Sequence, residues 1–144
     1  MKSIEIYTDG SCLKNPGTGG WAYILRYKDY VKEGFGAEFN TTNNRMELKA
    51  IIMALKALKE PCEVSLFTDS NLMVQSINEW LDGWIKKNFK DKKNVDLWKE
   101  YIKVAKIHKV KAFWIKAHNG HLENEKCDKL AREAALAKEN NEKN

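Results

Sequence analysis

The chain has 144 residues, of which 43% are hydrophobic and 31% are charged, and its formal net charge is +5. This length suits one domain with its own core, and no apolar run is long enough to span a bilayer. The cysteines Cys12, Cys62 and Cys127 lack metal-ligand spacing, so neither a disulfide framework nor a zinc site is expected. We expect a single domain over residues 1–144, monomeric, without a signal peptide or membrane partner, in a reducing cytoplasm.

The positive charge is concentrated between Trp84 and Lys116, where the chain carries eleven lysines and three acids, so the remainder is net negative. The aromatic residues Trp84, Phe89 and Trp98 lie in the same tract. Such a tract beside an acidic remainder is typical of a polyanion held by one part of a protein and worked on by another. A solvated lysine-rich helix face is the alternative, and the tryptophans favour the polyanion.

Apolar periodicity predicts alternating strands and helices along the chain. Gly83 and the lysine run 86–93 are expected to break the second helix, and the tail over 139–144 is expected to fray. In chain order, the predicted elements are strands over 3–8, 21–27 and 31–39, a helix over about 45–59, a strand over 63–68, a helix with Met73, Ile77, Trp80 and Trp84 on one stripe, a helix from Asn94 or Asp96 to about Ile107, a strand over 110–116 and a helix over about 124–138.

The order of these elements predicts an α/β fold built on a mixed five-stranded sheet. The first three strands follow one another through short connections, which indicates an antiparallel meander. The last two strands follow helices, and such crossovers make them parallel to a neighbour. We therefore expect three antiparallel strands, then two parallel strands, flanked by helices.

Two acidic residues, Asp9 and Asp69, each close an apolar strand as part of a Thr-Asp pair followed by a small residue. Ligands of open α/β sheets collect where strands end at a topological switch. Either aspartate alone is more often a turn former or a helix N-cap. Because both strands end in the same way, we expect the two carboxylates to meet at one edge of the sheet.

Two further acids lie on helices. Glu47 is placed near the start of its helix and toward the buried stripe, where an unpaired carboxylate is costly and the helix N-terminus offsets part of that cost. Asp128 lies near the start of the last helix, beside Cys127 on its packing side. Capping is the structural alternative for both. Together with Asp9 and Asp69 they make four carboxylates, which would repel one another at one site unless cations held them. This predicts a Mg²⁺ or Mn²⁺ site whose carboxyl groups have raised pKa values in the absence of metal.

His118 lies in a Gly-containing loop ahead of Asp128. An imidazole near bound metal can shuttle protons or help the product leave, and a surface histidine without a role is the alternative. His121 is expected to fix the loop by hydrogen bonding.

Five segments of the chain carry specific motifs: TDGSCLKNPGTGG (8–20), TTNNRMEL (41–48), TDS (68–70), NVDLW (94–98) and HNGHLENEKCDKLA (118–131). In these motifs the chain resembles the bacterial type 1 ribonuclease H family, and the resemblance covers nearly the whole sequence, from Ile4 to about Ala135. The segment between Trp84 and Trp98 is several residues shorter than in many members, and Ala117 replaces a common glycine.

The resemblance implies a ribonuclease H-like fold and hydrolysis of the RNA strand of RNA–DNA hybrids, leaving 5′-phosphate and 3′-hydroxyl ends. It implies two Mg²⁺ or Mn²⁺ ions on Asp9, Glu47, Asp69 and Asp128, with His118 as the catalytic loop histidine. The basic protrusion falls on about 80–97, and the DNA-phosphate pocket falls on Thr42 and Asn94. The remaining positions that match contacts to the hybrid are Gly10, Cys12, Asn15, Asn43, Asn44, Gln75 and Asn71, which replaces a common glutamine, together with Trp80, Trp84, Lys86 and Lys87 on the DNA strand.

Two other functions remain open at this point. An integrase-like nuclease uses a similar sheet and acids to cut DNA, but the Asn and Gln side chains suited to 2′-hydroxyl groups argue against it. A non-catalytic hybrid-binding module would keep the lysines and Trp84 while tolerating the loss of an acid. All four acids are present, which disfavours the second alternative.

Overall fold

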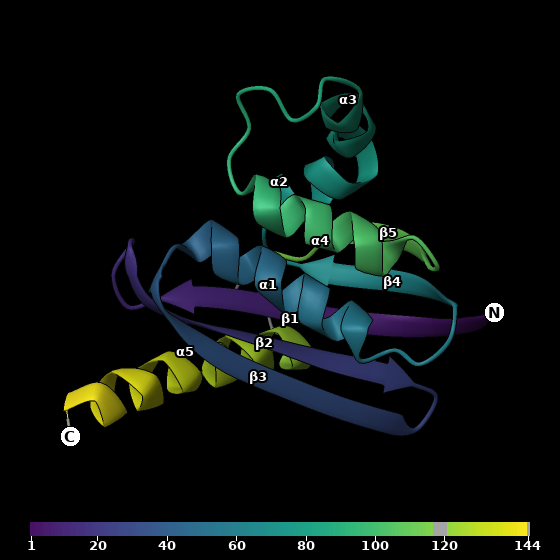
Figure 1. Ribbon diagram of the computed structural model, residues 1–144. Helices are drawn as coiled ribbons and strands as arrows, with labels where there is room; N and C mark the ends of the chain where they lie inside the picture. Colours follow the sequence, from purple (N-terminus) through teal and green to yellow (C-terminus); the bar gives the residue numbers. More distant parts are fainter. Residues whose placement is uncertain (117–120, 144) are drawn as a thin grey trace.

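A computed structural model describes residues 1–116 and 121–143. A five-stranded sheet with the strand order β3-β2-β1-β4-β5 forms its centre (Figure 1). The first three strands are antiparallel, while β4 pairs in parallel with β1 and β5 pairs in parallel with β4, which confirms the predicted mixed sheet. The strands are β1 (Lys2–Cys12), β2 (Gly17–Tyr27), β3 (Tyr30–Thr41), β4 (Cys62–Thr68) and β5 (Lys109–Trp114).

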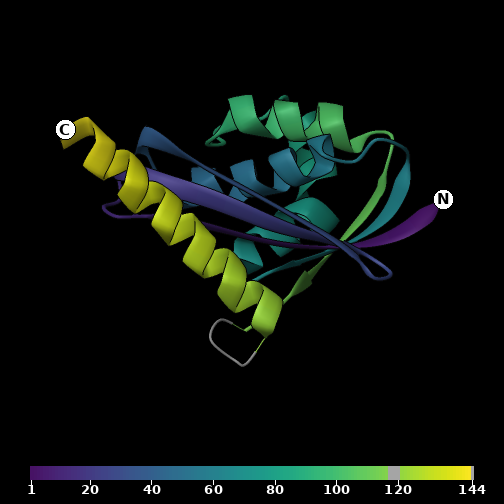
Figure 2. The ribbon, with the colours of Figure 1, turned by 90° about the horizontal axis from the view of Figure 1, so that it is seen from below.

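Helices cover both faces of this sheet. α1 (Asn43–Lys56) and α4 (Val95–Ala105) lie on one side, and α5 (Leu122–Lys143) crosses the other side (Figure 2). The main core lies under α1, where side chains such as Ile51 and Leu66 are fully buried. No helix among the described residues has both the length and the apolarity to cross a bilayer.

Small residues let α5 pack directly on β2. A Cβ atom placed on Gly20 would lie 2.0 Å from the carbonyl oxygen of Ala131, so only glycine fits against the helix backbone there. Ala22, Cys127 and Ala131 are fully buried in the same contact. This packing fixes the second turn of α5, which carries Asp128, against the middle of the sheet.

The second predicted helix is divided into three parts: α2 (Asn71–Gln75), a π-helical turn over Ser76–Trp80 and α3 (Leu81–Lys86). The prediction that Gly83 breaks this helix is wrong, because α3 passes through Gly83 and ends at Lys86. The Asn78 amide both donates to and accepts from the backbone of Ala112, at 2.8 and 3.0 Å. The π-helical turn is thereby tied to β5.

The aromatic residues of the basic tract do not all face solvent. Phe89 is 8% exposed and Trp98 is 4% exposed, and both belong to the hydrophobic core. The interpretation that they contribute to a polyanion-binding face is therefore wrong. They anchor the segment instead: the backbone N–H of Phe89 donates to the Trp84 carbonyl at 2.8 Å, and Trp98 packs edge-on against the Trp84 ring.

Several helices and strands are longer than the sequence predicted. β1 and β2 extend four residues further at the turn between them, and α5 runs from Leu122 to Lys143, through most of the segment where fraying was expected. The Thr18 hydroxyl donates to Glu139 and the Lys138 ammonium lies 4.4 Å from the centre of the Phe39 ring, and these contacts hold the last turns of α5 on the sheet.

Candidate active site

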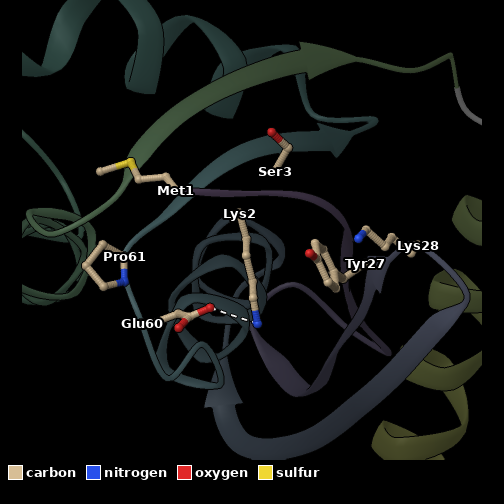
Figure 3. Close-up of a pocket in the computed structure, with 7 residues that line it drawn as sticks. All are labelled: Met1, Lys2, Ser3, Tyr27, Lys28, Glu60 and Pro61. Carbon is tan, nitrogen blue, oxygen red and sulfur yellow. Dashed lines mark ion pairs between the residues drawn. The ribbon is translucent and has the colours of Figure 1, made fainter.

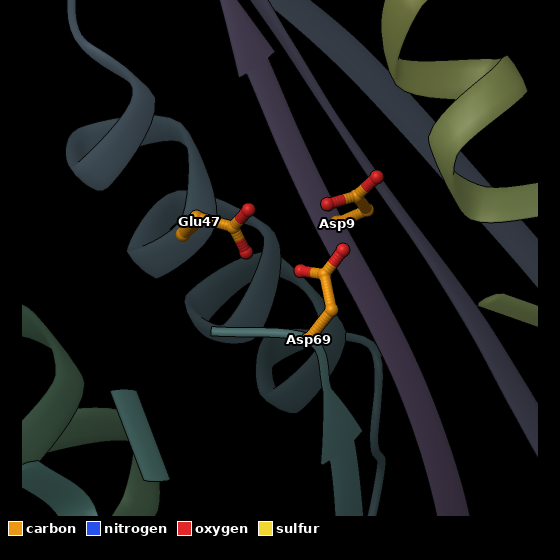
Figure 4. A group of neighbouring side chains, drawn as sticks. All are labelled: Asp9, Glu47 and Asp69. Carbon is orange, nitrogen blue, oxygen red and sulfur yellow. The ribbon is translucent and has the colours of Figure 1, made fainter. Parts of the chain in front are cut away.

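Three of the predicted acids meet where β1 and β4 end. Asp9 lies near the end of β1, Asp69 follows the last residue of β4, and Glu47 extends from the first turns of α1 (Figure 4). One carboxylate oxygen of each lies within 4.8 Å of the others. Their side chains point toward one another in Figure 4. The parallel pairing of β1 with β4 explains this convergence, because the carboxyl ends of both strands lie at the same edge of the sheet.

Gly10 brings the strand and the helix close enough for the acids to meet. A Cβ atom at this position would lie 2.3 Å from the backbone nitrogen of Glu47, which no side chain tolerates. The Asp-Gly pair of the sequence is therefore a packing requirement rather than an ordinary turn. The close approach places Asp9 and Glu47 on facing sides of one narrow space.

Burial and mutual repulsion raise the pKa values of these acids. Asp9 is 3% exposed, and burial first, then the charge of Asp69, raises its pKa to about 8. Burial and the charges of Asp9 and Asp69 hold the pKa of Glu47 well above its usual range, and the backbone amide of Gly10 opposes the shift. Without a cation, the site therefore holds protons that isolated carboxyl groups release.

The donor set fits a divalent cation. The Oε2 atom of Glu47 is buried and has no hydrogen-bond partner among the residues that the structure describes, which costs free energy unless a cation coordinates it. Within residues 1–116 and 121–143, no Lys or Arg forms an ion pair with Asp9 or Glu47. Carboxylate oxygens without a protein cation are the ligands that Mg²⁺ and Mn²⁺ favour.

Asp128 borders the cluster without belonging to its tight group of oxygens. It lies on α5 and raises the pKa of Asp9 through a side-chain hydrogen bond and its charge, so it is close to Asp9. Its Oδ2 atom also accepts from Nε of Arg132 at 3.1 Å. The structure thus gathers three of the four acids and places the fourth beside them. His118 lies outside the described residues, and His121 is exposed just before α5.

Three of the predicted substrate contacts form one hydrogen-bonded group. The backbone N–H of Cys12 donates to Oδ1 of Asn43 at 2.8 Å, and the backbone N–H of Asn43 donates to Oδ1 of Asn15 at 3.0 Å. These bonds join the turn after β1 to the start of α1 and orient the Asn43 amide. Asn44 follows on the exposed side of the same helix start.

The two residues of the predicted phosphate pocket are connected through Arg45. Thr42 caps α1 by accepting from the backbone N–H of Arg45, whose Nη1 atom donates to Oδ1 of Asn94 at 3.3 Å. Arg45 also grips Asp96 with bonds of 3.0 and 2.8 Å, which lowers the pKa of Asp96 to about 2. Sequence reasoning missed Arg45 and Asp96, although both lie in the motifs that supplied Thr42 and Asn94.

The basic segment 80–97 stands away from the sheet above α4 (Figure 1). Lys86 and Lys87 are exposed and Trp80 is 40% exposed, whereas Trp84 is half-buried between Trp80 and Trp98. Lys92 lies 5.0 Å from the centre of the Trp84 ring. Asn71 and Gln75 lie at the two ends of α2, whose N-cap Ser70 follows Asp69.

A surface hollow lies at the opposite end of β1 from the acids (Figure 3). Lys2 and Glu60 form an ion pair of 2.9 Å across it. None of the predicted site residues lines it, so it is separate from the candidate active site. The lining residues are Met1, Lys2, Ser3, Tyr27, Lys28, Glu60 and Pro61.

An α/β domain that gathers carboxylates at the ends of its central strands is typical of metal-dependent enzymes that cleave or transfer phosphoryl groups. A sequence model of the RNase H family matches residues 1–136. A ribonuclease HI of Campylobacter jejuni is 84% identical over 145 aligned residues, covering 99% of each chain. A ribonuclease H of Helicobacter pylori is 60% identical over 132 residues, covering 92% of each chain. The chain belongs to the ribonuclease H family, as a bacterial type 1 enzyme.

Solved structures agree with this assignment. LC9-RNase H1, a type 1 RNase H with the type 2 active-site motif, matches with a TM-score of 0.87 at 28% identity, covering 95% of this chain and 74% of that one. LC11-RNase H1 in complex with an RNA/DNA hybrid matches with a TM-score of 0.71 at 25% identity, covering 94% and 98%. The resemblance inferred from the sequence motifs is thereby confirmed at the level of family and fold.

Proposed function

We propose that this chain is an endoribonuclease that hydrolyses the RNA strand of RNA–DNA hybrids and leaves 5′-phosphate and 3′-hydroxyl ends. The observation that carries the proposal is the group of Asp9, Glu47 and Asp69 oxygens within 4.8 Å of one another. Asp9 and Glu47 are buried, and neither has a lysine or arginine partner in the described part of the chain. Its relatives' names and the hybrid bound to LC11-RNase H1 support this substrate.

In this proposal, Asp9, Glu47, Asp69 and Asp128 hold two Mg²⁺ ions, with Mn²⁺ as the alternative. The ions, when bound, activate water and stabilise the leaving 3′-oxygen of the RNA. The four carboxylates would hold these ions and would give up their protons as the ions bind. His118 is assigned the proton transfer at the leaving group, although this residue lies outside the described part of the chain.

Recognition of RNA rests on amides near the acids. Asn43, Asn44 and Gln75 carry donors and acceptors that suit 2′-hydroxyl groups, and the bond from Cys12 fixes the orientation of the Asn43 amide. Asn15, Asn71 and the backbone of Gly10 complete the proposed contacts along this strand. Because 2′-hydroxyl groups carry no base identity, cleavage is expected to depend little on sequence.

The DNA strand is assigned to two other places. Thr42 and Asn94 form a pocket for one DNA phosphate, held by the bonds of Arg45 to both residues. Trp80, Lys86 and Lys87 of the basic segment contact the strand further along, and the Trp84 ring packs against Trp80. These contacts position the duplex without reading its sequence.

We further propose that residues 1–144 act as one catalytic domain in the cytoplasm and that one chain is the catalytic unit, since it supplies every acid itself. The three cysteines Cys12, Cys62 and Cys127 are free thiols, which suits a reducing compartment.

A cleavage assay tests the function directly. Labelled RNA–DNA hybrid, double-stranded RNA and double-stranded DNA are incubated with the enzyme in Mg²⁺, in Mn²⁺ and in EDTA. The proposal expects cleavage of the RNA strand of the hybrid alone, abolished by EDTA. Cutting of duplex DNA with equal efficiency would favour an integrase-like nuclease, and binding without cleavage would identify a hybrid-binding module.

A further inference from the structure

The edge strand β3 exposes a row of large apolar side chains. β3 is the outermost strand on the β2 side of the sheet, far from β4 and β5 (Figure 1). Val31, Phe35 and Phe39 alternate along one face of it and are 48%, 60% and 40% exposed. An edge strand also directs unpaired backbone groups outward, and native proteins usually protect such an edge with charges.

Helix α5 contacts this face near both ends of β3. Lys126 pairs with Glu33 at 2.9 Å, and the Lys138 ammonium lies over the Phe39 ring. Phe35 lies between these contacts and remains the most exposed of the three apolar residues. The fold therefore leaves the centre of β3 both apolar on its surface and open along its edge.

We propose that β3 pairs in antiparallel fashion with β3 of a second copy of this chain, about a two-fold axis at Phe35. The sequence of the strand is self-complementary in this register. Phe35 meets the partner's Phe35, Val31 meets the partner's Phe39, and Lys32 meets the partner's Glu38. The charged pair and the apolar pair each occur twice because of the symmetry.

Neighbouring registers lose this complementarity. A shift by one residue in one direction sets Glu33 against the partner's Glu38, and a shift in the other direction sets Val31 against it. Glu38 is available to Lys32 of a second copy because its own contact with Lys49 is long, at 3.8 Å. Charge complementarity therefore selects one register.

Glycines keep the other face of the paired strands smooth. Gly34 meets the partner's Gly36 in the proposed register. Each glycine already lies under a ring of β2, since a Cβ atom at Gly34 would be 2.3 Å from Tyr23 and one at Gly36 would be 2.4 Å from Trp21. The rings fill the space that side chains of β3 would occupy, so the strands meet without steric conflict.

The proposed pairing leaves the candidate active site open. Asp9 lies on β1, two strands inward from β3. The basic segment 80–97 lies toward the opposite edge of the sheet, the edge formed by β4 and β5 (Figure 1). Self-association is thus independent of the proposed nuclease activity, and it departs from the monomer expected from the sequence.

Sedimentation equilibrium over a concentration series tests the proposal. The wild-type chain is expected to show a reversible monomer–dimer equilibrium. Lys32→Glu and Glu38→Lys are each expected to weaken self-association by about tenfold, because like charges then face each other twice. An equimolar mixture of the two variants restores the dimer, since the introduced glutamate of one variant then faces the introduced lysine of the other.

Matched controls separate this effect from misfolding and from the catalytic function. Phe35→Lys is expected to abolish the dimer, whereas Ile107→Lys, at a residue 51% exposed far from β3, leaves it unchanged. Both variants retain hybrid cleavage at the wild-type rate. A wild-type chain that stays monomeric throughout the series, or a variant mixture that fails to recover the dimer, would overturn the pairing. A wild type that associates equally with Phe35→Lys would place the interface elsewhere.

Discussion

The acidic cluster and the basic segment differ in the burial of their charged side chains. Asp9 and Glu47 are buried between a strand and a helix, with positions fixed by the close packing at Gly10. Lys86 and Lys87 extend into solvent from a segment that is anchored by Phe89 and Trp98. Buried carboxylates interact strongly and demand a cation, whereas exposed lysines act weakly, additively and under the control of salt. The first arrangement suits chemistry at one phosphate and the second suits holding many phosphates.

The largest expected effect comes from removing one acid. Asp9→Asn is expected to lower the rate of hybrid cleavage by at least about 100-fold, because one preorganised electrostatic group is lost. Hybrid binding survives, since the lysines and tryptophans are untouched. Single-turnover cleavage and filter binding measure the two properties separately. Near-normal turnover of this variant in saturating Mg²⁺ would refute the role of the cluster.

The next largest effect is the pH dependence of Mg²⁺ binding, which is expected of the acidic cluster and not of the basic segment. The pKa of Asp9 is raised from 3.8 to about 8, so below pH 8 a cation must displace its proton. Mg²⁺ affinity is therefore expected to rise by up to about tenfold per pH unit toward pH 8 and to level off above it. Calorimetric titration at several pH values gives the affinity directly. Binding that is flat between pH 6 and 8 would contradict the raised pKa.

The stability of the metal-free protein is expected to fall as the pH rises, whereas the Mg²⁺ affinity rises. A carboxyl group with a raised pKa contributes stability that is fully present below 3.8 and is lost as the pH rises through about 8. Mg²⁺ at about a hundredfold its Kd is expected to restore about 2.7 kcal/mol near pH 8, or roughly 5–10 °C in Tm. Asp9→Asn, the control, melts higher than wild type without metal and gains less from Mg²⁺. Identical melting with and without millimolar Mg²⁺ would argue against a crowded acidic site.

The smallest effect belongs to the basic segment. Lys86→Ala combined with Lys87→Ala is expected to weaken hybrid binding and to flatten the slope of log affinity against log salt by up to about 2. Lys109→Ala with Lys111→Ala on β5 removes the same charge elsewhere and serves as the control. An unaltered slope in the first pair would show that these lysines do not contact phosphate.

The positions of the acids followed from sequence because local rules agreed there. Strand-terminal Thr-Asp pairs and the buried side of a helix located Asp9, Asp69 and Glu47, and the crossovers placed both strand ends at one edge. The extent of α5 did not follow, because Glu139 and Lys138 are polar and their contacts with Thr18 and Phe39, which lie far away in the sequence, help hold the last turns.

The remaining features could not be predicted from the sequence because they depend on contacts between distant segments. Arg45 and Asp96 form a bidentate pair across 51 positions, and neither residue is unusual in its own segment. Phe89 seemed suited to a nucleic-acid surface beside its lysines, yet a turn with a positive φ directs it into the core. Burial of a single aromatic residue in a charged loop depends on tertiary packing that periodicity does not reveal.

The electrostatic crowding of the cluster is tested most directly by the titration of the Asp9 carboxyl group. Carbon-13 NMR of the metal-free protein, with Asp9→Asn to assign the signal, follows its protonation across the pH range. We expect a midpoint near 8 that falls when Mg²⁺ is added. A midpoint near 3.8 in the absence of metal would show that the neighbouring carboxylates and burial do not govern this site.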